Sequence, residues 1–268
     1  MTLNNLINNY LKHNYKKFVI ADQNEFISII KFRVKVDEYK KLILKKKKDS
    51  KDNFGIAIYI ERSIDYIAII FACLLTKTYY VPLSLNSKSD LIDNQIKESR
   101  VSFLFSKKNN HIELLSVNEK IKKIKNHKLA YIIFTSGSTG NKKGVKINRS
   151  SLVSYINSIK LVTKKNNYFK SLLISGELTF DISLADFAFA FIFKSKIIIT
   201  ENSNNLISLF HLIKKYYPEA IYAVPTTWQR IIQFSENFKD IEFNKIKYLN
   251  SGGEALKRDL VTKLYKIF

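Results

Sequence analysis

The residues best suited to chemistry lie in one stretch, where an apolar segment from Leu129 to Phe134 runs into Thr-Ser-Gly-Ser-Thr-Gly and then two lysines. The residues of interest in it are four with hydroxyl groups, three glycines and the second of the two lysines: Thr135, Ser136, Ser138, Thr139, Gly137, Gly140, Gly144 and Lys143. Glycine allows a ligand to approach the backbone closely. Free N–H groups, hydroxyls and an ammonium favour oxyanions, most often phosphate. The stretch therefore predicts a phosphate-binding loop after a buried strand, although it does not fit G-x-x-x-x-G-K-[ST].

A polar connection from a strand to a helix, with no ligand, is the alternative, since Gly, Ser and Thr are ordinary loop residues.

Strand patterns elsewhere alternate with helical patterns, which predicts an α/β fold of parallel βαβ units and a doubly wound sheet. The predicted strands are Phe54–Ile60, Tyr79–Leu83, Val101–Phe105, Ser171–Ile174, Lys196–Thr200, Ala220–Val224 and Lys247–Asn250. The predicted helices are Asn5–Tyr15, Val36–Lys46, Ser63–Leu75, Leu91–Glu98, Ser150–Val162, Ile182–Phe193, Leu206–Tyr216, Thr227–Phe234 and Asp259–Ile267. Phosphate ligands in such sheets bind beyond the carboxyl ends of the strands.

Two other segments are less regular. Phe26–Val34 is rich in β-branched residues and suggests a strand or irregular structure, whereas 109–128 is polar, lysine-rich and suggests a connector.

The composition narrows the class of protein. A hydrophobic content of 46% in 268 residues is ample for a core. The single cysteine, Cys73, excludes an internal disulfide and fits a reducing compartment. The N-terminus lacks the apolar core of a signal peptide, and the longest apolar run is too short to cross a bilayer. We therefore expect a cytoplasmic protein that acts without a membrane.

The net charge of +22 raises the alternative of a nucleic-acid partner. Against it, 39 of the 45 basic residues are lysine and only six are arginine, the better reader of bases. The one dense cluster, Lys45–Lys48, closes a predicted helix and suggests a solvated helix end. We expect no nucleic acid as partner.

The string TSGSTG-x-x-KG after a hydrophobic strand resembles the signature loop of the adenylate-forming (AMP-binding) superfamily. The resemblance implies that Thr135 to Gly140, with Lys143, hold the phosphates of ATP, and that Thr135 and Lys143 act as catalytic groups. It also implies Mg²⁺ that arrives with ATP and lies near Thr135, with no metal site formed by the chain alone.

Further segments extend the likeness. Glu61-Arg62-Ser63 and Tyr80-Val81-Pro82-Leu83 resemble a second core motif of adenylation domains. The sequence also departs from the family, with Lys77 for a glycine, Ser84 for an acid, Arg149 for a histidine and Lys142 for a proline. Lys77 puts the local turn in question.

Phe180-Asp181-Ile182-Ser183 resembles the F-D-x-S motif of amino-acid-activating members, in which the aspartate binds the α-ammonium of the substrate. A carboxylate at the start of a helix can pair with a cation and orient it. The alternative is that Asp181 only caps the helix that follows. By the same resemblance the side-chain pocket is lined by Ala185, Tyr222, Leu249 and Ser251, and the ATP site also includes Gly252, Gly253 and Glu254. Ordinary sheet packing is the alternative for each of these residues.

Taken together, the chain resembles the N-terminal part of an amino acid adenylation domain, of the nonribosomal peptide synthetase or D-alanine–carrier protein ligase type. The resemblance implies activation of an amino acid as aminoacyl-AMP and transfer to the phosphopantetheine thiol of a carrier protein. A carboxylate–CoA ligase, and a non-catalytic nucleotide-binding remnant or split subunit, are the alternatives.

The resemblance also predicts how the chain is divided. We expect one incomplete AMP-binding domain over 1–268, with a first βα region at about 1–108, a connector at 109–128 and the signature loop and substrate pocket at 129–268. The family continues beyond Phe268 with segments for Mg²⁺, ribose and a catalytic lysine, so we expect a C-terminal part, which could be a separate half.

Overall fold

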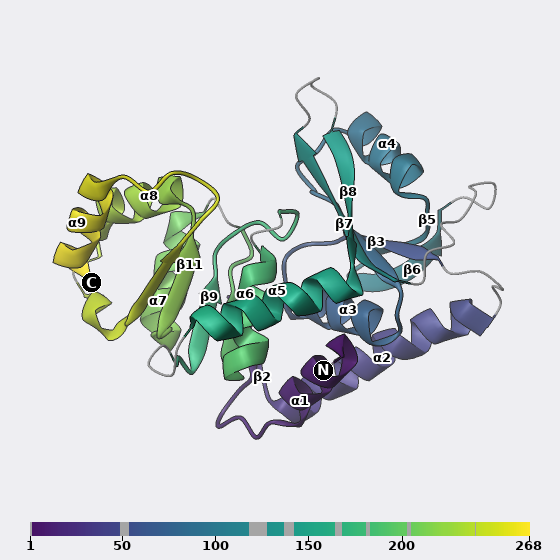
Figure 1. Ribbon diagram of the computed structural model, residues 1–268, viewed down its shortest axis with the longest axis horizontal. Helices are drawn as coiled ribbons and strands as arrows, with labels where there is room; N and C mark the ends of the chain where they lie inside the picture. The colour runs from purple at the N-terminus through teal and green to yellow at the C-terminus, as the bar shows by residue number, and fades with distance from the viewer. Residues whose placement is uncertain are drawn as a thin grey trace.

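The chain folds into two six-stranded sheets with a layer of helices between them (Figure 1). The computed structural model describes residues 2–48, 54–117, 128–136, 142–163, 168–180, 183–202, 205–238 and 240–268. We call the sheet with strand order β12-β11-β9-β10-β1-β2 the first sheet, and the sheet with order β6-β5-β3-β4-β7-β8 the second sheet.

Both sheets are parallel in the middle and end in antiparallel strands. The first sheet consists of β1 (Ile20–Ala21), β2 (Phe26–Ile27), β9 (Ser171–Ile174), β10 (Lys196–Ile199), β11 (Ala220–Ala223) and β12 (Tyr248–Ser251). Only β2 is antiparallel to its neighbour there. The second sheet consists of β3 (Gly55–Tyr59), β4 (Tyr79–Pro82), β5 (Val101–Lys108), β6 (His111–Ser116), β7 (Leu129–Ser136) and β8 (Lys142–Asn148). Its outer strands β6 and β8 are antiparallel to their neighbours.

The main core lies where the helical layer touches both sheets. It joins Ile58 and Ile133 of the second sheet to Ile174 and Ile197 of the first through the buried faces of four helices. These helices are α1 (Leu3–Lys12), α3 (Ile64–Leu75), α5 (Arg149–Val162) and α6 (Ser183–Phe193), and α2 (Ile29–Lys48) packs against α3. Because one core serves both sheets, the fold fixes the sheets relative to each other.

Other helices cover the outer faces of the two sheets. Apolar residues of α7 (Leu206–Tyr216), α8 (Pro225–Ser235) and α9 (Arg258–Ile267) pack on the first sheet. A short 3-10 helix, Phe243–Lys245, belongs to the same cluster. The helix α4 (Ser89–Ser99) contributes Ile92 to the core on the outer face of the second sheet.

The expectation of parallel βαβ units is confirmed, but the strands form two sheets where the sequence suggested one. Ser63 caps α3 through its side chain, as expected, and Cys73 is fully buried. The predicted strand or irregular structure at Phe26–Val34 was wrong beyond Ile27, because α2 begins at Ile29.

Two strands, β6 and β8, were not predicted from the sequence. The expected connector at 109–128 contains β6, and polar residues just after the glycine-rich stretch form β8. A strand therefore follows the expected phosphate loop, and the helix comes later. Asn148 occupies the N-cap of α5, two residues before the predicted start of that helix at Ser150.

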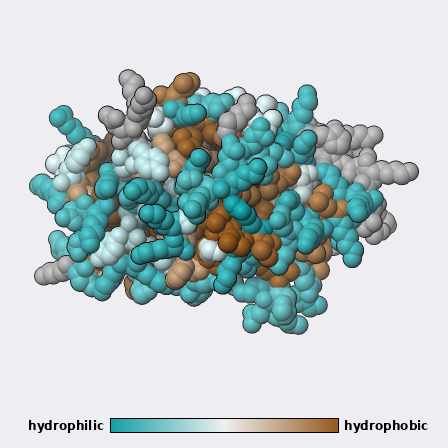
Figure 2. Space-filling model, turned by 90° about the horizontal axis from the view of Figure 1, so that it is seen from below, coloured by the Kyte–Doolittle hydropathy of each residue, from teal (hydrophilic) through white to brown (hydrophobic). Residues whose placement is uncertain are grey.

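The surface is mostly hydrophilic on the side that carries α1 and α2, with hydrophobic side chains visible between the hydrophilic ones (Figure 2).

The lysines at the C-terminal end of α2 are only partly solvated. Lys47 donates to the carbonyl of Thr76 at 2.8 Å, and the Nζ of Lys46 lies 5.5 Å from the ring centre of Phe103. Within the ranges given above, no helix is long and apolar enough to cross a membrane.

Candidate functional site

The carboxyl ends of strands from both sheets open onto one cavity. Its volume is about 200 Å³, and its walls follow directly after four parallel strands. Ile60, Glu61 and Arg62 follow β3, Leu83 to Asn86 follow β4, Glu177 to Thr179 follow β9, and Glu201 and Asn202 follow β10. The cavity thus lies at the edge where α/β sheets bind ligands.

The hairpin of β7 and β8 places Thr135 opposite Lys143 at the same carboxyl edge of the second sheet. Side chains alternate between the faces of a strand, and paired residues share a face. Thr135 and Lys143 therefore share the face of Ile133, which is buried against the helical layer between the sheets. Both side chains are exposed, so an oxyanion can reach the hydroxyl and the ammonium together.

The neighbouring lysine points the other way. Lys142 shares the face of Phe134 and Gly144, which is the face that α4 covers. It lines a groove there with residues of α4, where Glu98 accepts a hydrogen bond from the Gly144 amide at 3.0 Å. The two adjacent lysines thus serve different faces of the hairpin.

Several of the predicted residues lie outside the described residues. These are Gly137, Ser138, Thr139, Gly140 and Asp181, as well as the side chain of Ser136. The residues on either side of the Asp181-Ile182 pair are described. Ser183 is 2% exposed and its hydroxyl donates to the carbonyl of Phe180 at 2.7 Å, while Phe180 is 54% exposed. The roles of these residues remain predictions.

The four residues predicted to line a side-chain pocket are not all brought together. Tyr222 lies on the face of the first sheet covered by α6, with its ring 6.4 Å from that of Phe189, and Ala185 is buried in α6 itself. The parallel register pairs Tyr222 with Asn250. It pairs Leu249 with Ile221 and Ser251 with Ala223, so Leu249 and Ser251 lie on the opposite face.

The glycine pair after β12 is required by its surroundings. A Cβ on Gly252 would lie 2.4 Å from the hydroxyl oxygen of Tyr222, and Gly253 has a φ of 86°, which favours glycine. Glu254 accepts hydrogen bonds from the amide of Thr226 at 3.3 Å and from its hydroxyl at 3.2 Å, so it caps the start of α8. That Glu254 also belongs to the ATP site is still a prediction.

Four polar residues of this region carried no predicted role. Arg62, Tyr66 and Asp186 are at most 7% exposed, and the side-chain amide nitrogen of Asn250 is buried. Within the described part of the chain, the oxygens of Tyr66 and Asp186 and the nitrogen of Asn250 have no hydrogen-bond partner. A signal for two of them was present, since Arg62 is one of few arginines in a lysine-rich chain and Asp186 interrupts an apolar helix.

Burial governs the electrostatics of these groups. It raises the pKa of the Asp186 carboxyl well above its ordinary value, and the charge of Arg62 acts in the opposite direction. Burial also lowers the pKa of the Arg62 guanidinium, which the charges of Glu177 and Asp186 oppose. The guanidinium therefore serves as the buried counter-charge of this region.

Sequence comparison assigns the class of protein. The family model described as AMP-binding enzyme matches residues 16–268. The chain therefore belongs to the AMP-binding enzyme family.

Individual relatives are distant and much longer. The chain is 28% identical over 244 residues to polyketide synthase PksN of Bacillus subtilis, which covers 80% of this chain and 4% of that protein. It is 23% identical over 254 residues to gramicidin S synthase 2 of Brevibacillus brevis, which covers 88% of this chain and 6% of that protein. The chain thus spans less than a tenth of these relatives.

A solved structure confirms the fold. The N-terminal subdomain of Klebsiella oxytoca NpsA, in complex with 3-hydroxyanthranilyl-AMSN, superposes with a TM-score of 0.79 at 14% identity. The match covers 100% of this chain and 70% of that chain. The fold is that of the N-terminal subdomain of adenylate-forming enzymes.

Proposed function

We propose that this chain binds ATP and an amino acid at the facing carboxyl edges of its two sheets and takes part in forming aminoacyl-AMP. The observation that carries the proposal is the pair of Thr135 and Lys143, which share one face of the hairpin beside the expected phosphate loop. Family membership and the relation to gramicidin S synthase 2 support the same class of reaction. We further propose a carrier-protein thiol as the acceptor of the aminoacyl group.

The reaction is attack of a carboxylate oxygen of the amino acid on the α-phosphorus of ATP. A new O–P bond forms, the bond from that phosphorus to the bridging oxygen breaks, and pyrophosphate leaves with the electron pair. Phosphoryl chemistry of this kind depends mainly on positioning and on neutralising charge. The ammonium of Lys143 would neutralise phosphate charge, the hydroxyl of Thr135 would donate to a phosphate oxygen, and Asp181 would hold the α-ammonium of the substrate.

Mg²⁺ fits this site as a companion of the nucleotide. The described residues contain no group of three or more His, Cys, Asp or Glu side chains placed to hold a metal ion. A metal would therefore be held chiefly by the phosphates, with the exposed hydroxyl of Thr135 as an oxygen ligand from the protein. When bound, the ion shares the negative charge of the leaving pyrophosphate.

The test is exchange of labelled pyrophosphate into ATP, with amino acids and with acids that lack an amino group. Exchange that depends on an amino acid is the expected result. Exchange driven only by aryl or fatty acids would instead identify a carboxylate–CoA ligase. If the longest natural form of the protein binds ATP but catalyses no pyrophosphate exchange, the protein is a non-catalytic nucleotide-binding subunit.

A further inference from the structure

Arg62 belongs to the second sheet by sequence but binds the first sheet with its side chain. It follows β3 directly, and its guanidinium donates three hydrogen bonds to backbone carbonyls of the first sheet's strand ends. The Nε donates to Thr200 at 2.7 Å, and the two terminal nitrogens donate to Ile174 at 3.0 Å and to Gly176. Arg62 is 7% exposed, so these bonds are shielded from water.

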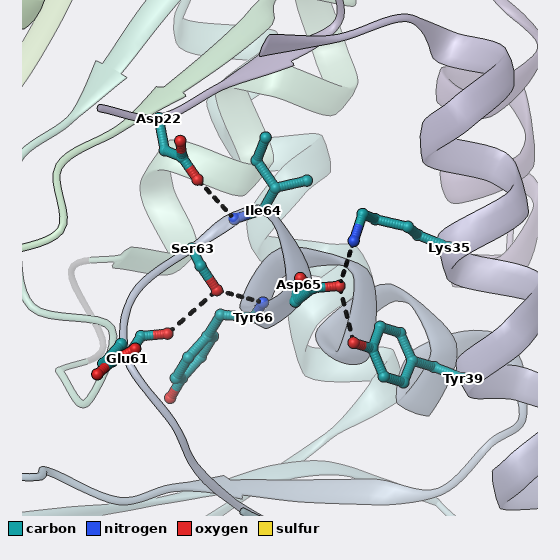
Figure 3. A network of polar contacts seen from close by, with 8 residues as sticks. All are labelled: Asp22, Lys35, Tyr39, Glu61, Ser63, Ile64, Asp65 and Tyr66. Carbon is teal, nitrogen blue, oxygen red and sulfur yellow. Dashed lines mark hydrogen bonds and ion pairs between the residues drawn. The ribbon is translucent and has the colours of Figure 1, made fainter. Parts of the chain in front are cut away.

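The turn that carries Arg62 is itself held on both sides (Figure 3). Ser63 donates to the carbonyl of Glu61 at 3.2 Å and accepts from the amide of Tyr66 at 3.3 Å. Asp22, at the end of β1, accepts from the amide of Ile64 at 3.4 Å. The guanidinium therefore projects from a fixed support.

In the first turn of α3, Asp65 strengthens this support. Its carboxylate accepts from Lys35 at 2.8 Å and from the hydroxyl of Tyr39 at 2.7 Å, which ties the start of α3 to α2 (Figure 3). The support for Arg62 thus reaches from the first sheet to α2.

Two of the three carbonyls that Arg62 binds, those of Ile174 and Gly176, lie at the start of the segment that joins β9 to α6, and the third, that of Thr200, follows β10. The described part of this segment, 174–180, lines the cavity with Glu177, Leu178 and Thr179, and Asp181 follows it in the sequence. Its start is tied to β11, where the hydroxyl of Ser175 donates to the carbonyl of Tyr222 at 2.7 Å. Arg62 ties the next residue, Gly176, to the opposite sheet.

Arginine suits this position better than lysine. Its planar guanidinium offers five N–H groups in fixed directions, so it can bind three separate carbonyls at once and remain charged. A lysine ammonium is a compact point charge on a flexible stem and cannot reproduce that geometry. The charge of Arg62 also acts on Asp186 in α6, where it opposes the rise in the pKa of that carboxyl caused by burial.

We infer that Arg62 is the positioning residue of segment 174–180, which it holds from the opposite sheet so that the acid substrate can bind beside it. Arg62 lies in the cavity wall, but its guanidinium donates to the three carbonyls, so it acts on the acid substrate through the segment. It therefore sets the affinity for the acid substrate and leaves the affinity for ATP unchanged. The part that concerns the substrate rests on the function proposed above.

The test compares Arg62→Lys with Arg33→Lys. Arg33 is a matched control, because its Nε also donates to a backbone carbonyl, that of Leu11 at 2.6 Å, and it lies on α2. Two quantities are measured: hydrogen exchange of the amides at 175–180, and the dissociation constants of ATP and of an aminoacyl sulfamoyl-adenosine. For Arg62→Lys we expect exchange to rise at least tenfold at 175–180 and analogue affinity to fall at least tenfold, with ATP affinity within twofold.

A purely structural role predicts a different pattern. Exchange that rises across the whole chain, with equal losses for ATP and the analogue, would overturn the inference, as would behaviour like that of Arg33→Lys. If Arg62→Lys does not fold, Arg62→Gln provides the same comparison with a neutral donor in place of the guanidinium. Hydrogen exchange needs no ligand, so it tests whether Arg62 holds residues 175–180 even if the wild-type chain binds no analogue. Failure of the wild-type chain to bind the analogue would contradict the proposed function and not the positioning role of Arg62.

Discussion

At the scale of single residues, the hairpin places two adjacent lysines on opposite faces. Lys143 shares the face of Thr135, toward the helical layer, whereas Lys142 shares the face of Gly144, toward α4. The period of a strand makes this difference, and the sequence pattern did not predict that β8 is a strand at all. The adjacent pair therefore provides its own control.

The lysine pair yields the first prediction. Lys143→Ala removes a charge-assisted contact to phosphate that contributes about 1.5–3 kcal/mol, so ATP affinity should fall by roughly 10- to 100-fold. Lys142→Ala should change ATP affinity by less than about twofold, because its side chain faces α4. Calorimetric titration with a non-hydrolysable ATP analogue measures both. Equal losses in the two variants would show that only net charge matters.

Asp186 yields a prediction about pH. Because the pKa of its carboxyl is raised in the folded state, the folded protein retains a proton that the unfolded chain loses above about pH 4. The contribution of this group to stability is therefore present at low pH and is lost as the pH rises toward the folded-state pKa.

The variant Asp186→Asn removes this titration. We expect its free energy of unfolding, relative to wild type, to improve as the pH rises from 5 to 8. Asp37→Asn is the control, since the Asp37 side chain is 58% exposed in an i,i+3 pair with Lys40. Thermal unfolding at both pH values gives the comparison. If the difference in unfolding free energy between the variant and wild type is the same at pH 5 and pH 8, Asp186 is ionised in the folded protein at both pH values.

At the scale of elements, the sequence predicted most helices and parallel strands but failed where burial overrides local preference. The β-branched residues of Phe26–Val34 favour a strand, yet the buried residues of α2 are Ile29, Phe32, Val36, Tyr39 and Ile43, a helical stripe. Leu42 lies off this stripe and is 41% exposed.

The edge strands failed for a different reason. β6 and β8 lie at the edges of the second sheet and carry polar and lysine residues, as edge strands often do. Such residues are also typical of loops, so composition could not distinguish the two. The family resemblance grouped Leu249 and Ser251 with Tyr222, and the register of β12 places these two residues on the opposite face of the first sheet.

The close approach of β11 to the glycine pair can be tested directly. Gly252→Ala places a Cβ 2.4 Å from the hydroxyl oxygen of Tyr222, and overpacking of this kind costs about 1–3 kcal/mol. In a Tyr222→Phe background the nearest atom is the ring carbon at 3.4 Å, so most of that cost should disappear. A double-mutant cycle on the free energy of unfolding measures the coupling. Additive effects would show that the two residues do not touch.

At the scale of the whole molecule, the helical layer joins two sheets whose carboxyl edges share one cavity. The sequence located the phosphate-binding stretch and the family. It could not show that a side chain from one sheet would hold the other, because the contact of Arg62 with Ile174 spans 112 residues. Contacts so distant in sequence leave no local pattern.

The charge of +22 also acts on the whole molecule. We expect weak, sequence-independent binding to oligonucleotides that falls by about 100-fold or more between 50 and 200 mM salt, as counterion release dictates. Filter binding or fluorescence anisotropy with two unrelated sequences measures this. Tight binding at 200 mM salt with a preference for one sequence would instead indicate a nucleic-acid partner.

The most direct measurement is a titration of the chain with two adenylate analogues that differ only in one group. One is an aminoacyl sulfamoyl-adenosine, and the other is the same compound without the α-amino group. The proposed function predicts saturable binding of both and at least tenfold tighter binding of the first, because a carboxylate pairs with the α-ammonium. Equal affinity, or tighter binding of the compound without the amino group, would contradict the activation of an amino acid.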